Sequence, residues 1–335
     1  MICSIFMANC IFLYPQAYRI GSIISKEGLT MDIHNVFSVL NRNYDVNIQN
    51  IELFREGGNC SYVIRDIRRN YFLKIIRAPF LETALQSIDV QMYLLSVQFP
   101  VIPIILTKSG HPYVHVTEYG NKCIFVLFNY VPGDEPAPED TENAGKLIGR
   151  LHQVMKSYPG KLAVKGKDFF IDRYVDIMKK VQYEKTEFFL SYGNELWERV
   201  KDLPREYCHC DLYRGNLHKT SDNSMYVLDF DTSCIAFPVY DIVLFCNDTH
   251  YFDYDRNGYV KTKERLEEFV KGYQRYCQLS QEEISAFYSF IAIYHFQLQA
   301  TMLELHGYDS SIVEFFDKQY DWLLRWESDC QRDLK

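Results

Sequence analysis

The sequence predicts an α+β protein in two parts, a β-rich N-terminal part and a mainly helical C-terminal part. Runs rich in β-branched and aromatic residues dominate between about residues 51 and 130. A breaker with three prolines and a glycine follows at residues 131–138, and beyond it apolar residues recur mostly at helical spacing. We therefore expect the first part to cover residues 31–131 and the second part to cover residues 132–335.

The composition is that of a globular chain that can form one large or two medium domains. Of its 335 residues 47% are hydrophobic, and the net charge is -8. An acidic surface argues against general nucleic-acid binding, which depends on Lys and Arg to neutralise phosphates. The ten cysteines show no CxxC pair, which favours reduced, mostly buried thiols in the cytoplasm. No nucleic-acid partner is expected, and the oligomeric state is left open.

Residues 1–30 differ in sequence character from the rest of the chain. Met1–Tyr14 is apolar, but it lacks a basic segment and is too short to span a bilayer. Met31 opens an ordinary helical segment, DIHNVFSVLNRNY. We favour Met31 as the natural start, with a short hydrophobic anchor as the alternative. No association with a membrane is expected.

The N-terminal part is expected to be a mostly antiparallel sheet with one helix. Strands are predicted at Ser61–Ile64 and Tyr71–Ile76, and then over residues 101–107, 113–118 and 123–130. A helix that stops before Pro100 is predicted by apolar residues at helical spacing, namely Leu85, Ile88, Met92 and Leu95.

The C-terminal part reads as helices with one exception. Short strands are predicted at Leu217–His218 and over residues 225–230. Two capping boxes precede long apolar helices, one made by Ser280 with Glu283 and the other by Ser311 with Glu314.

The segment HCDLYRGN, followed by DFD, contains the candidate catalytic and metal-binding residues. Asp211 stands two residues after His209 and five before Asn216, a spacing typical of phosphoryl transfer with Mg²⁺. Asp211 can accept the proton of a substrate hydroxyl, while Asn216 and Asp229 offer the hard oxygen ligands that suit Mg²⁺.

Two neighbours of these residues are expected to have supporting roles. Asp231 is a candidate second carboxylate near the metal or a bridging group. His209 is expected to hold the loop through backbone hydrogen bonds rather than to react.

Lys74 lies within a hydrophobic strand, so its ammonium group must reach a polar place. A kinase uses such a strand lysine to bind the α- and β-phosphates. Gly57, Gly58 and Asn59, in the preceding turn, can bring backbone N–H groups close to phosphates. The alternative is an edge-strand lysine that points to water.

These motifs resemble the aminoglycoside phosphotransferase-like kinases, a group that also includes choline, homoserine and methylthioribose kinases and spore-coat-associated kinase homologues. The matching segments occur in family order: FREGGNCSYVI, YFLKII, VLFNYVPG, GKLIGRLH, HCDLYRGNL, VLDFDTS and PVYDIVLF. The resemblance implies a two-lobed protein-kinase-like fold that binds ATP and Mg²⁺.

Carried over to this chain, the resemblance assigns a role to each matching position. Asp211 becomes the catalytic base, Asn216 and Asp229 become the Mg²⁺ ligands, and Lys74 becomes the phosphate-binding lysine. The adenine-contacting hinge falls on Asn129, Tyr130 and Val131, and Asp241 is implied to brace the catalytic loop.

The chain departs from the family and from protein kinases at two points. The helix glutamate that usually pairs with the strand lysine has no clean counterpart, and Asp89 and Glu82 are the nearest candidates. Asp229-Phe230 is followed by Asp231 rather than by Gly, and no Ala-Pro-Glu segment precedes Asp241, so a protein kinase is disfavoured.

A second motif has the spacing of an EF-hand Ca²⁺ loop. Its ligand positions fall on Asp253, Asp255, Asn257, Tyr259 and Glu264. The competing interpretation is an acidic turn that ends where a helix starts.

The expected function is thus transfer of the γ-phosphate of ATP to a hydroxyl of a small molecule such as an aminoglycoside, an amino alcohol, homoserine or a sugar. The competing hypothesis is a non-catalytic or spore-associated protein that keeps the kinase fold. The sequence does not disclose the acceptor.

Overall fold

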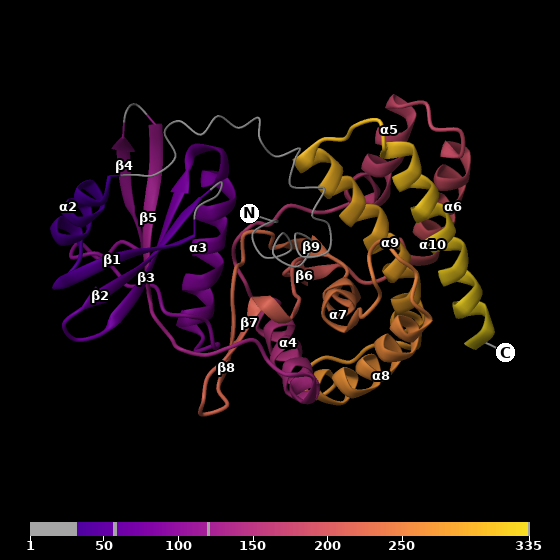
Figure 1. Ribbon diagram of the computed structural model, residues 1–335. Helices are drawn as coiled ribbons and strands as arrows, with labels where there is room; N and C mark the ends of the chain where they lie inside the picture. Colours follow the sequence, from indigo (N-terminus) through magenta and orange to yellow (C-terminus); the bar gives the residue numbers. More distant parts are fainter. Residues whose placement is uncertain (1–31, 56–58, 119–120, 334–335) are drawn as a thin grey trace. The chain divides into compact units, whose positions relative to one another are not determined.

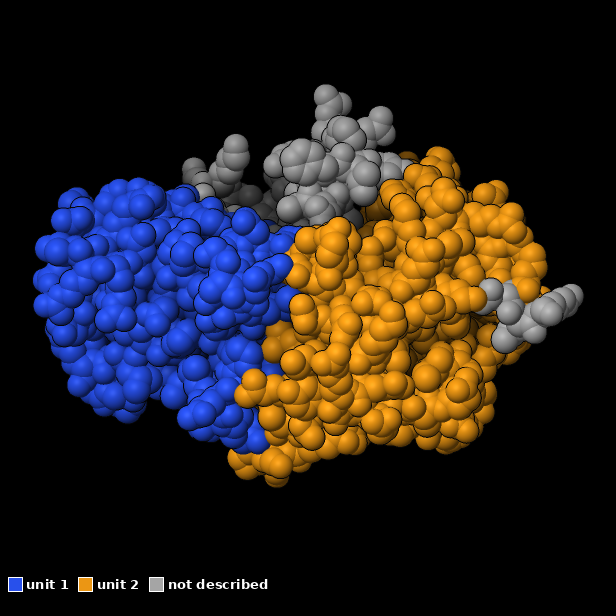
Figure 2. Space-filling view, turned by 90° about the horizontal axis from the view of Figure 1, so that it is seen from below, with its two compact units in different colours: residues 1–135, 215–232 blue, residues 136–214, 233–335 orange. Residues whose placement is uncertain are grey.

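The computed structural model describes residues 32–333 except 56–58 and 119–120. It divides into two compact units, coloured separately in Figure 2. Unit 1 consists of residues 1–135 and 215–232, and unit 2 of residues 136–214 and 233–335. The predicted leader, residues 1–30, lies outside the described residues.

Unit 1 is built on a five-stranded antiparallel sheet in the order β1-β2-β3-β5-β4 (Figure 1). Its strands are β1 Ile48–Arg55, β2 Cys60–Asp66, β3 Asn70–Arg77, β4 Val114–Glu118 and β5 Asn121–Asn129. Its helices are α2 Ile33–Asn43 and α3 Leu81–Ser96. The predicted antiparallel sheet and its single following helix are confirmed.

The two faces of this sheet are covered by different helices. Strand β3 alternates, so that Leu73 and Ile75 join one core cluster with Leu40 of α2. The opposite face carries Ile76, which packs in a second cluster with Ile88 of α3. Phe72 and Lys74 belong to this second face by the same alternation, so the strand lysine is directed to the side of α3 rather than to water.

Residues 101–107, which we predicted to be a strand, do not form one. Only isolated bridges occur there, between Val101 and Val227 and between Ile104 and Phe128. Pro100 and Pro103 explain the error because they have no N–H to donate to a continuous ladder.

The predicted strand over residues 225–230 is shorter in the structure. Strand β8, Met225–Val227, pairs with β7, Leu217–Lys219, and ends before Asp229, whose φ is 54°. A left-handed residue cannot continue a strand.

The hairpin of residues 215–232 packs with the N-terminal unit, although the sequence placed all of residues 132–335 together. Asp134 and Lys219 exchange backbone hydrogen bonds of 3.0 and 2.8 Å. A Cβ at Gly133 would stand 2.3 Å from the carbonyl oxygen of Lys219, so glycine permits this close approach. The breaker segment is therefore partly paired with β7, and the division between the units falls just after Glu135.

Unit 2 is mainly helical (Figure 1). Its helices are α4 Thr141–Met155, α5 Arg173–Lys180, α6 Thr186–Val200, α7 Pro238–Cys246, α8 Arg256–Tyr273, α9 Gln281–His306 and α10 Ile312–Asp333. A π-helical turn at Asp168–Asp172 precedes α5, and two short strands, β6 Glu206–Cys208 and β9 Cys234–Ala236, pair antiparallel.

Helix α9 is the centre of this unit, and most of its residues between Phe287 and Thr301 are buried. The predicted capping box is confirmed, because Ser280 N donates to Glu283 and Glu283 N donates to Ser280 Oγ. At the start of α10, Ser311 N donates to Asp309 Oδ1 at 2.8 Å rather than to Glu314, and the Ser311 hydroxyl donates to the same oxygen at 2.6 Å. Among the described helices, none combines the length and the apolar character that crossing a bilayer requires.

The EF-hand interpretation is wrong. Helix α8 already begins at Arg256, and the Asp255 carboxylate accepts a hydrogen bond of 2.9 Å from Asn257 N as its N-cap. Tyr259 and Glu264 are therefore helical and cannot fold around an ion as a 12-residue loop does. The competing interpretation, an acidic turn that ends at a helix start, fits the structure, and Asp253 is exposed in that turn.

Helices α4 and α8 approach closely at glycines. A Cβ at Gly272 would lie 1.9 Å from the carbonyl oxygen of Glu142, and one at Gly145 would lie 2.1 Å from that of Phe269. Because both neighbours are backbone atoms, the helices would have to move apart.

We predict that Gly272→Ala lowers the free energy of unfolding by about 3 kcal/mol, the upper range for overpacking a core. Chemical denaturation measures this change. Glu267→Ala, at an exposed position of the same helix, is the control and should change little. Equal stability of the two variants would contradict the close packing.

Candidate functional site

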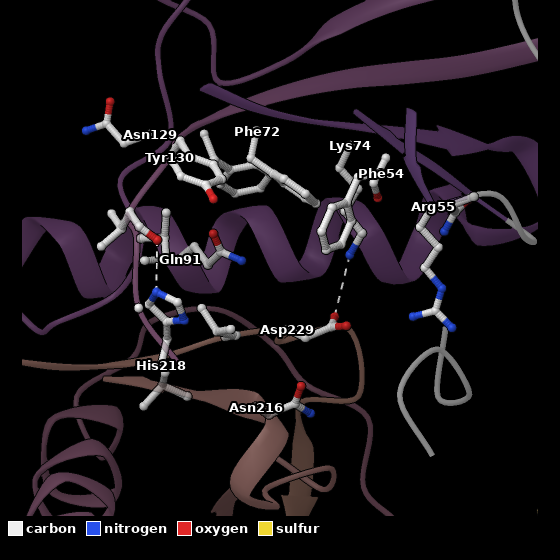
Figure 3. Close-up of a pocket in the computed structure, with 18 residues that line it drawn as sticks. Phe54, Arg55, Phe72, Lys74, Gln91, Asn129, Tyr130, Asn216, His218 and Asp229 are labelled. Carbon is white, nitrogen blue, oxygen red and sulfur yellow. Dashed lines mark hydrogen bonds and ion pairs between the residues drawn. The ribbon is translucent and has the colours of Figure 1, made fainter. Parts of the chain in front are cut away.

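A pocket of about 430 Å³ lies within unit 1 (Figure 3). Its walls come from the sheet, from α3 and from the β7–β8 hairpin. The lining residues are Phe54, Arg55, Asn59, Ser61, Phe72, Lys74, Gln91, Ile102, Phe128, Asn129, Tyr130, Val131, Gly133, Asn216, His218, Val227, Leu228 and Asp229. Its volume is in the range of small-molecule sites.

One side of the pocket carries apolar side chains. Its apolar lining comes from Phe72, Ile102, Phe128, Val227 and Leu228. Figure 3 shows Asn129 and Tyr130 on this side, away from Lys74 and Arg55. Such a surface suits the faces of a planar ring.

The segment after β5 is held in place by hydrogen bonds. Asn129 N donates to the carbonyl oxygen of Pro103 at 3.0 Å, and Tyr130 N donates to that of Asn70 at 3.2 Å. The carbonyl oxygen of Val131 accepts from His218 Nε2 at 2.9 Å (Figure 3). This last contact ties the segment to the β7–β8 hairpin.

The other side of the pocket is polar and centred on Lys74. The Lys74 ammonium lies 3.1 Å from Asp231 Oδ2 and 3.5 Å from Asp229 Oδ1. Burial works to lower the pKa of Lys74, but the two carboxylates outweigh it and the pKa is raised. Lys74 therefore stays charged at neutral pH. Neither Asp89 nor Glu82 is its partner, because both are exposed to solvent.

Asn216 and Asp229 are brought together by the hairpin. Leu228 N donates to the carbonyl oxygen of Asn216 at 2.9 Å, which places the residue before Asp229 against Asn216. Both side chains line the pocket, and Figure 3 shows both beneath Lys74. An amide oxygen and a carboxylate are hard donors of the kind that Mg²⁺ takes. The donor set fits that ion.

Asn59 faces the same pocket and is only 7% exposed. Its Oδ1 accepts from Arg77 N at 3.1 Å, whereas its Nδ2 has no hydrogen-bond partner within the described part of the chain. A buried donor left unmatched costs free energy unless a ligand oxygen satisfies it. Gly57 and Gly58, predicted with Asn59 to approach phosphates, lie outside the described residues.

The loop that carries Asp211 belongs to unit 2 and is organised by Asp241. This carboxylate is fully buried and accepts from His209 N at 2.7 Å and from Cys210 N at 2.8 Å. It also accepts from His152 Nε2 at 3.0 Å. Cys210 has a φ of 62°, so the chain turns sharply just before Asp211.

His152 and Tyr273 support Asp241 in turn. The other ring nitrogen of His152, Nδ1, is hydrogen-bonded to the Tyr273 hydroxyl at 2.7 Å. The ring of His152 is thereby held between Asp241 and Tyr273 of α8. His209 itself is buried, and its backbone N–H is what the carboxylate holds.

Asp211 is partly exposed and lies within electrostatic reach of two buried tyrosines. Burial is the main cause of the raised pKa of Tyr294, and Tyr251, Tyr240 and the Asp211 carboxylate add to it. The pKa of Tyr240 is raised mainly by burial too, with Asp211 among the lesser causes. Both tyrosines therefore keep their hydroxyl protons at neutral pH.

The structure collects most of the predicted pocket residues in one place. Seven of them line the pocket: Lys74, Asn59, Asn129, Tyr130, Val131, Asn216 and Asp229. Asp231 joins them through Lys74, while Asp211, His209 and Asp241 belong to unit 2.

Eleven of the 18 lining residues were not predicted from the sequence, and four of them show why. Phe72 shares a strand face with Lys74, and His218 stands two residues after Asn216, so alternation could have indicated both. Phe54 and Gln91 gave no comparable signal, since they reach the pocket only through the packing of β1 and α3.

Comparison with known proteins identifies the family. The profile of the phosphotransferase enzyme family matches residues 52–279. Homoserine kinase from Rhizobium meliloti (strain 1021) is 25% identical over 197 residues, which is 57% of this chain and 54% of that protein. Homoserine kinase from Agrobacterium fabrum (strain C58 / ATCC 33970) is 25% identical over 196 residues, with 56% and 54% covered. The chain therefore spans about half the length of these curated relatives.

Solved structures share the fold over nearly the whole chain. Amicoumacin kinase hAmiN, in complex with AMP-PNP and Ca²⁺, superimposes with a TM-score of 0.68 at 17% identity, covering 90% of this chain and 94% of that one. A microcompartment-associated aminopropanol kinase gives 0.66 at 18% identity, with 89% and 95% covered. These likenesses show the protein-kinase-like fold alone.

The resemblance drawn from the sequence motifs is thereby confirmed. The profile covers more than half of the 335 residues and contains both the lysine strand and the HCDLYRGN segment. The chain belongs to the phosphotransferase enzyme family.

Proposed function

We propose that the protein transfers the γ-phosphate of ATP to a hydroxyl group of a small molecule. The observation that carries this proposal is the pocket of unit 1, whose lining combines the charged Lys74, the carboxylate of Asp229 and the amide of Asn216 with apolar side chains. A base-binding surface next to a phosphate-binding cation is what a nucleoside triphosphate requires. We place the activity in the cytoplasm, where ATP is available.

Different parts of the pocket bind different parts of the nucleotide. The adenine ring lies on the apolar side, next to Asn129, Tyr130 and Val131. Lys74 binds phosphate oxygens as a point charge. The unmatched Nδ2 of Asn59 donates to a further phosphate oxygen, which satisfies its buried N–H group.

Asn216 and Asp229 would hold Mg²⁺ through an amide oxygen and a carboxylate oxygen. When bound, the ion neutralises charge on the β- and γ-phosphates and so favours their transfer. The residues themselves are positioned for this before the nucleotide arrives, because the hairpin fixes Asn216 against the residue before Asp229.

Asp211 acts on the acceptor. Its carboxylate accepts the hydroxyl proton while the acceptor oxygen bonds to the γ-phosphorus and ADP leaves. Asp241 does not react in this proposal. It holds the backbone of His209 and Cys210, and thereby keeps the turn that presents Asp211.

The acceptor class follows from the relatives as a proposal of the same kind. They include homoserine kinases, an aminopropanol kinase and a spectinomycin phosphotransferase. We therefore expect a small, hydroxyl-bearing acceptor such as an amino alcohol, homoserine, an aminoglycoside or a sugar.

The experiment is a screen for acceptor-dependent ADP release with Mg-ATP, after calorimetry has established that Mg-ATP binds. We expect one acceptor class to raise ADP release well above the rate without acceptor. Binding of Mg-ATP without stimulation by any acceptor class would instead favour a non-catalytic protein that keeps the fold. Transfer to a protein substrate alone would favour a protein kinase.

A further inference from the structure

We propose that Asp231 is the residue that positions Lys74 for the nucleotide, in place of an acid on α3. This inference rests on the function proposed above. Kinases of this general architecture pair the strand lysine with a glutamate of the following helix. In this chain that pairing is replaced by a carboxylate two residues beyond Asp229.

The face that α3 turns to the sheet carries no acid within the described helix. The buried positions of α3 are Ala84, Ser87, Ile88, Val90, Gln91 and Leu94. Ser87 and Gln91 are its only polar side chains in that buried set, and they stand four residues apart on one face. Glu82 and Asp89 point to solvent. The helix therefore offers a hydroxyl and an amide where a charge partner is usual.

Asp231 supplies the acidic partner of Lys74 that α3 lacks. Its Oδ2 lies 3.1 Å from the lysine ammonium, closer than the 3.5 Å of Asp229 Oδ1. Its side chain is also the more buried of the two, with 8% exposed against 21%. Asp229 lines the pocket, whereas Asp231 is not among the lining residues. The two carboxylates thus differ in access to a ligand.

Ser87 connects Asp231 to the helix. The Ser87 hydroxyl donates a hydrogen bond to the Asp231 carboxylate, which also forms the 3.1 Å ion pair with Lys74. Asp231 is therefore a buried anion held between a lysine on β3 and a hydroxyl on α3. This arrangement fixes the ammonium at the pocket wall, 3.5 Å from Asp229 Oδ1.

The first test uses the nucleotide-free protein and measures acylation of Lys74 by mass spectrometry. Only the neutral amine reacts, and the carboxylates of Asp229 and Asp231 both raise the lysine pKa against the effect of burial. Asp231→Asn should therefore increase acylation of Lys74 by about tenfold for each pKa unit lost. The exposed Lys122 is the internal reference and should not change.

The second test measures ATP affinity and the Mg²⁺ requirement. Asp231→Asn should weaken ATP binding by about tenfold, as loss of a charge-assisted contact does, at an unchanged half-saturating Mg²⁺ concentration. Asp229→Asn, the matched variant, should instead raise the Mg²⁺ requirement. Ser87→Glu in the Asp231→Asn background should restore part of the ATP affinity by supplying a helix acid.

The outcomes separate the two proposals. If Asp231→Asn raises only the Mg²⁺ requirement and leaves Lys74 acylation unchanged, Asp231 is a metal ligand and the positioning role is wrong. Folding of each variant is checked by thermal unfolding, and Ser87→Ala, which removes only the hydroxyl, should have a smaller effect in the same direction. Failure of the wild type to bind Mg-ATP would refute the proposed function, while the acylation ratio would still decide whether Asp231 holds Lys74.

Discussion

Replacing Asp211 with Asn is expected to lower kcat by about 10²–10⁴-fold, the usual contribution of a general base. An amide has the shape of the carboxylate but cannot accept the acceptor proton. The nucleotide pocket belongs to unit 1 and contains none of the Asp211 loop, so the affinity for Mg-ATP should be nearly unchanged. Steady-state ADP release at saturating acceptor gives kcat, and calorimetry gives the affinity.

Asp176→Asn is the control for this variant. Asp176 is an exposed carboxylate of α5, in the same unit, whose partner is Lys179 on the surface. Its removal should leave both quantities unchanged. If Asp211→Asn turned over at the wild-type rate, Asp211 would not be the base, and the identification of HCDLYRGN as a catalytic loop would be lost.

Replacing Lys74 with Met is expected to have two large effects. It removes the cation that we propose binds phosphate, so kcat/KM for ATP should fall by about 100-fold or more, equivalent to about 3 kcal/mol. It also leaves the buried Asp231 without its charge partner, which should cost about 3–5 kcal/mol of stability. Lys122→Met, at an exposed position of β5 in the same sheet, is the matched control.

The stability effect of Lys74→Met has a defined pH dependence. In the wild type the Asp231 pKa is lowered, so its stabilisation is present above the ordinary carboxylate pKa and is lost as the pH falls. In the variant, burial without the lysine raises the Asp231 pKa, so the penalty is largest near neutral pH and is relieved by protonation. The stability gap between wild type and variant should therefore narrow as the pH falls from about 7 to about 4. Denaturant unfolding at several pH values measures this gap, and a constant gap would contradict the buried pair.

The sequence predicts much of this pocket because its main parts are local patterns. Lys74 lies in a run that reads as a strand by itself, and alternation places it on the face opposite Leu73 and Ile75. The spacing of Asp211, Asn216 and Asp229 is equally local, since a turn and a short hairpin set it.

What the sequence could not provide depends on packing between distant segments. The partner of Lys74 is decided by which face α3 turns inward, and that choice buries Ser87 and exposes Glu82 and Asp89. The membership of the β7–β8 hairpin in unit 1 depends on the bridge between Asp134 and Lys219. Neither follows from periodicity along the chain.

The wrong predictions have local physical causes that a spacing rule ignores. The EF-hand pattern requires only certain residue types at fixed intervals. Asp255, however, is also a good N-cap, and the helix that begins after it includes the remaining positions of the pattern. The strand predicted over residues 101–107 has the right apolar residues, but Pro103 within it and Pro100 just before it interrupt a ladder.

Transfer of the γ-phosphate to an acceptor hydroxyl is tested most directly by the chemical identity of the product. The protein, Mg-ATP and each acceptor that stimulates ADP release are incubated together, and the acceptor is examined by ³¹P NMR and mass spectrometry. We expect a phosphate monoester on an acceptor hydroxyl, formed in equal amount to ADP and absent with Asp211→Asn. Release of inorganic phosphate with an unmodified acceptor, or a monoester that forms equally well without Asp211, would contradict it.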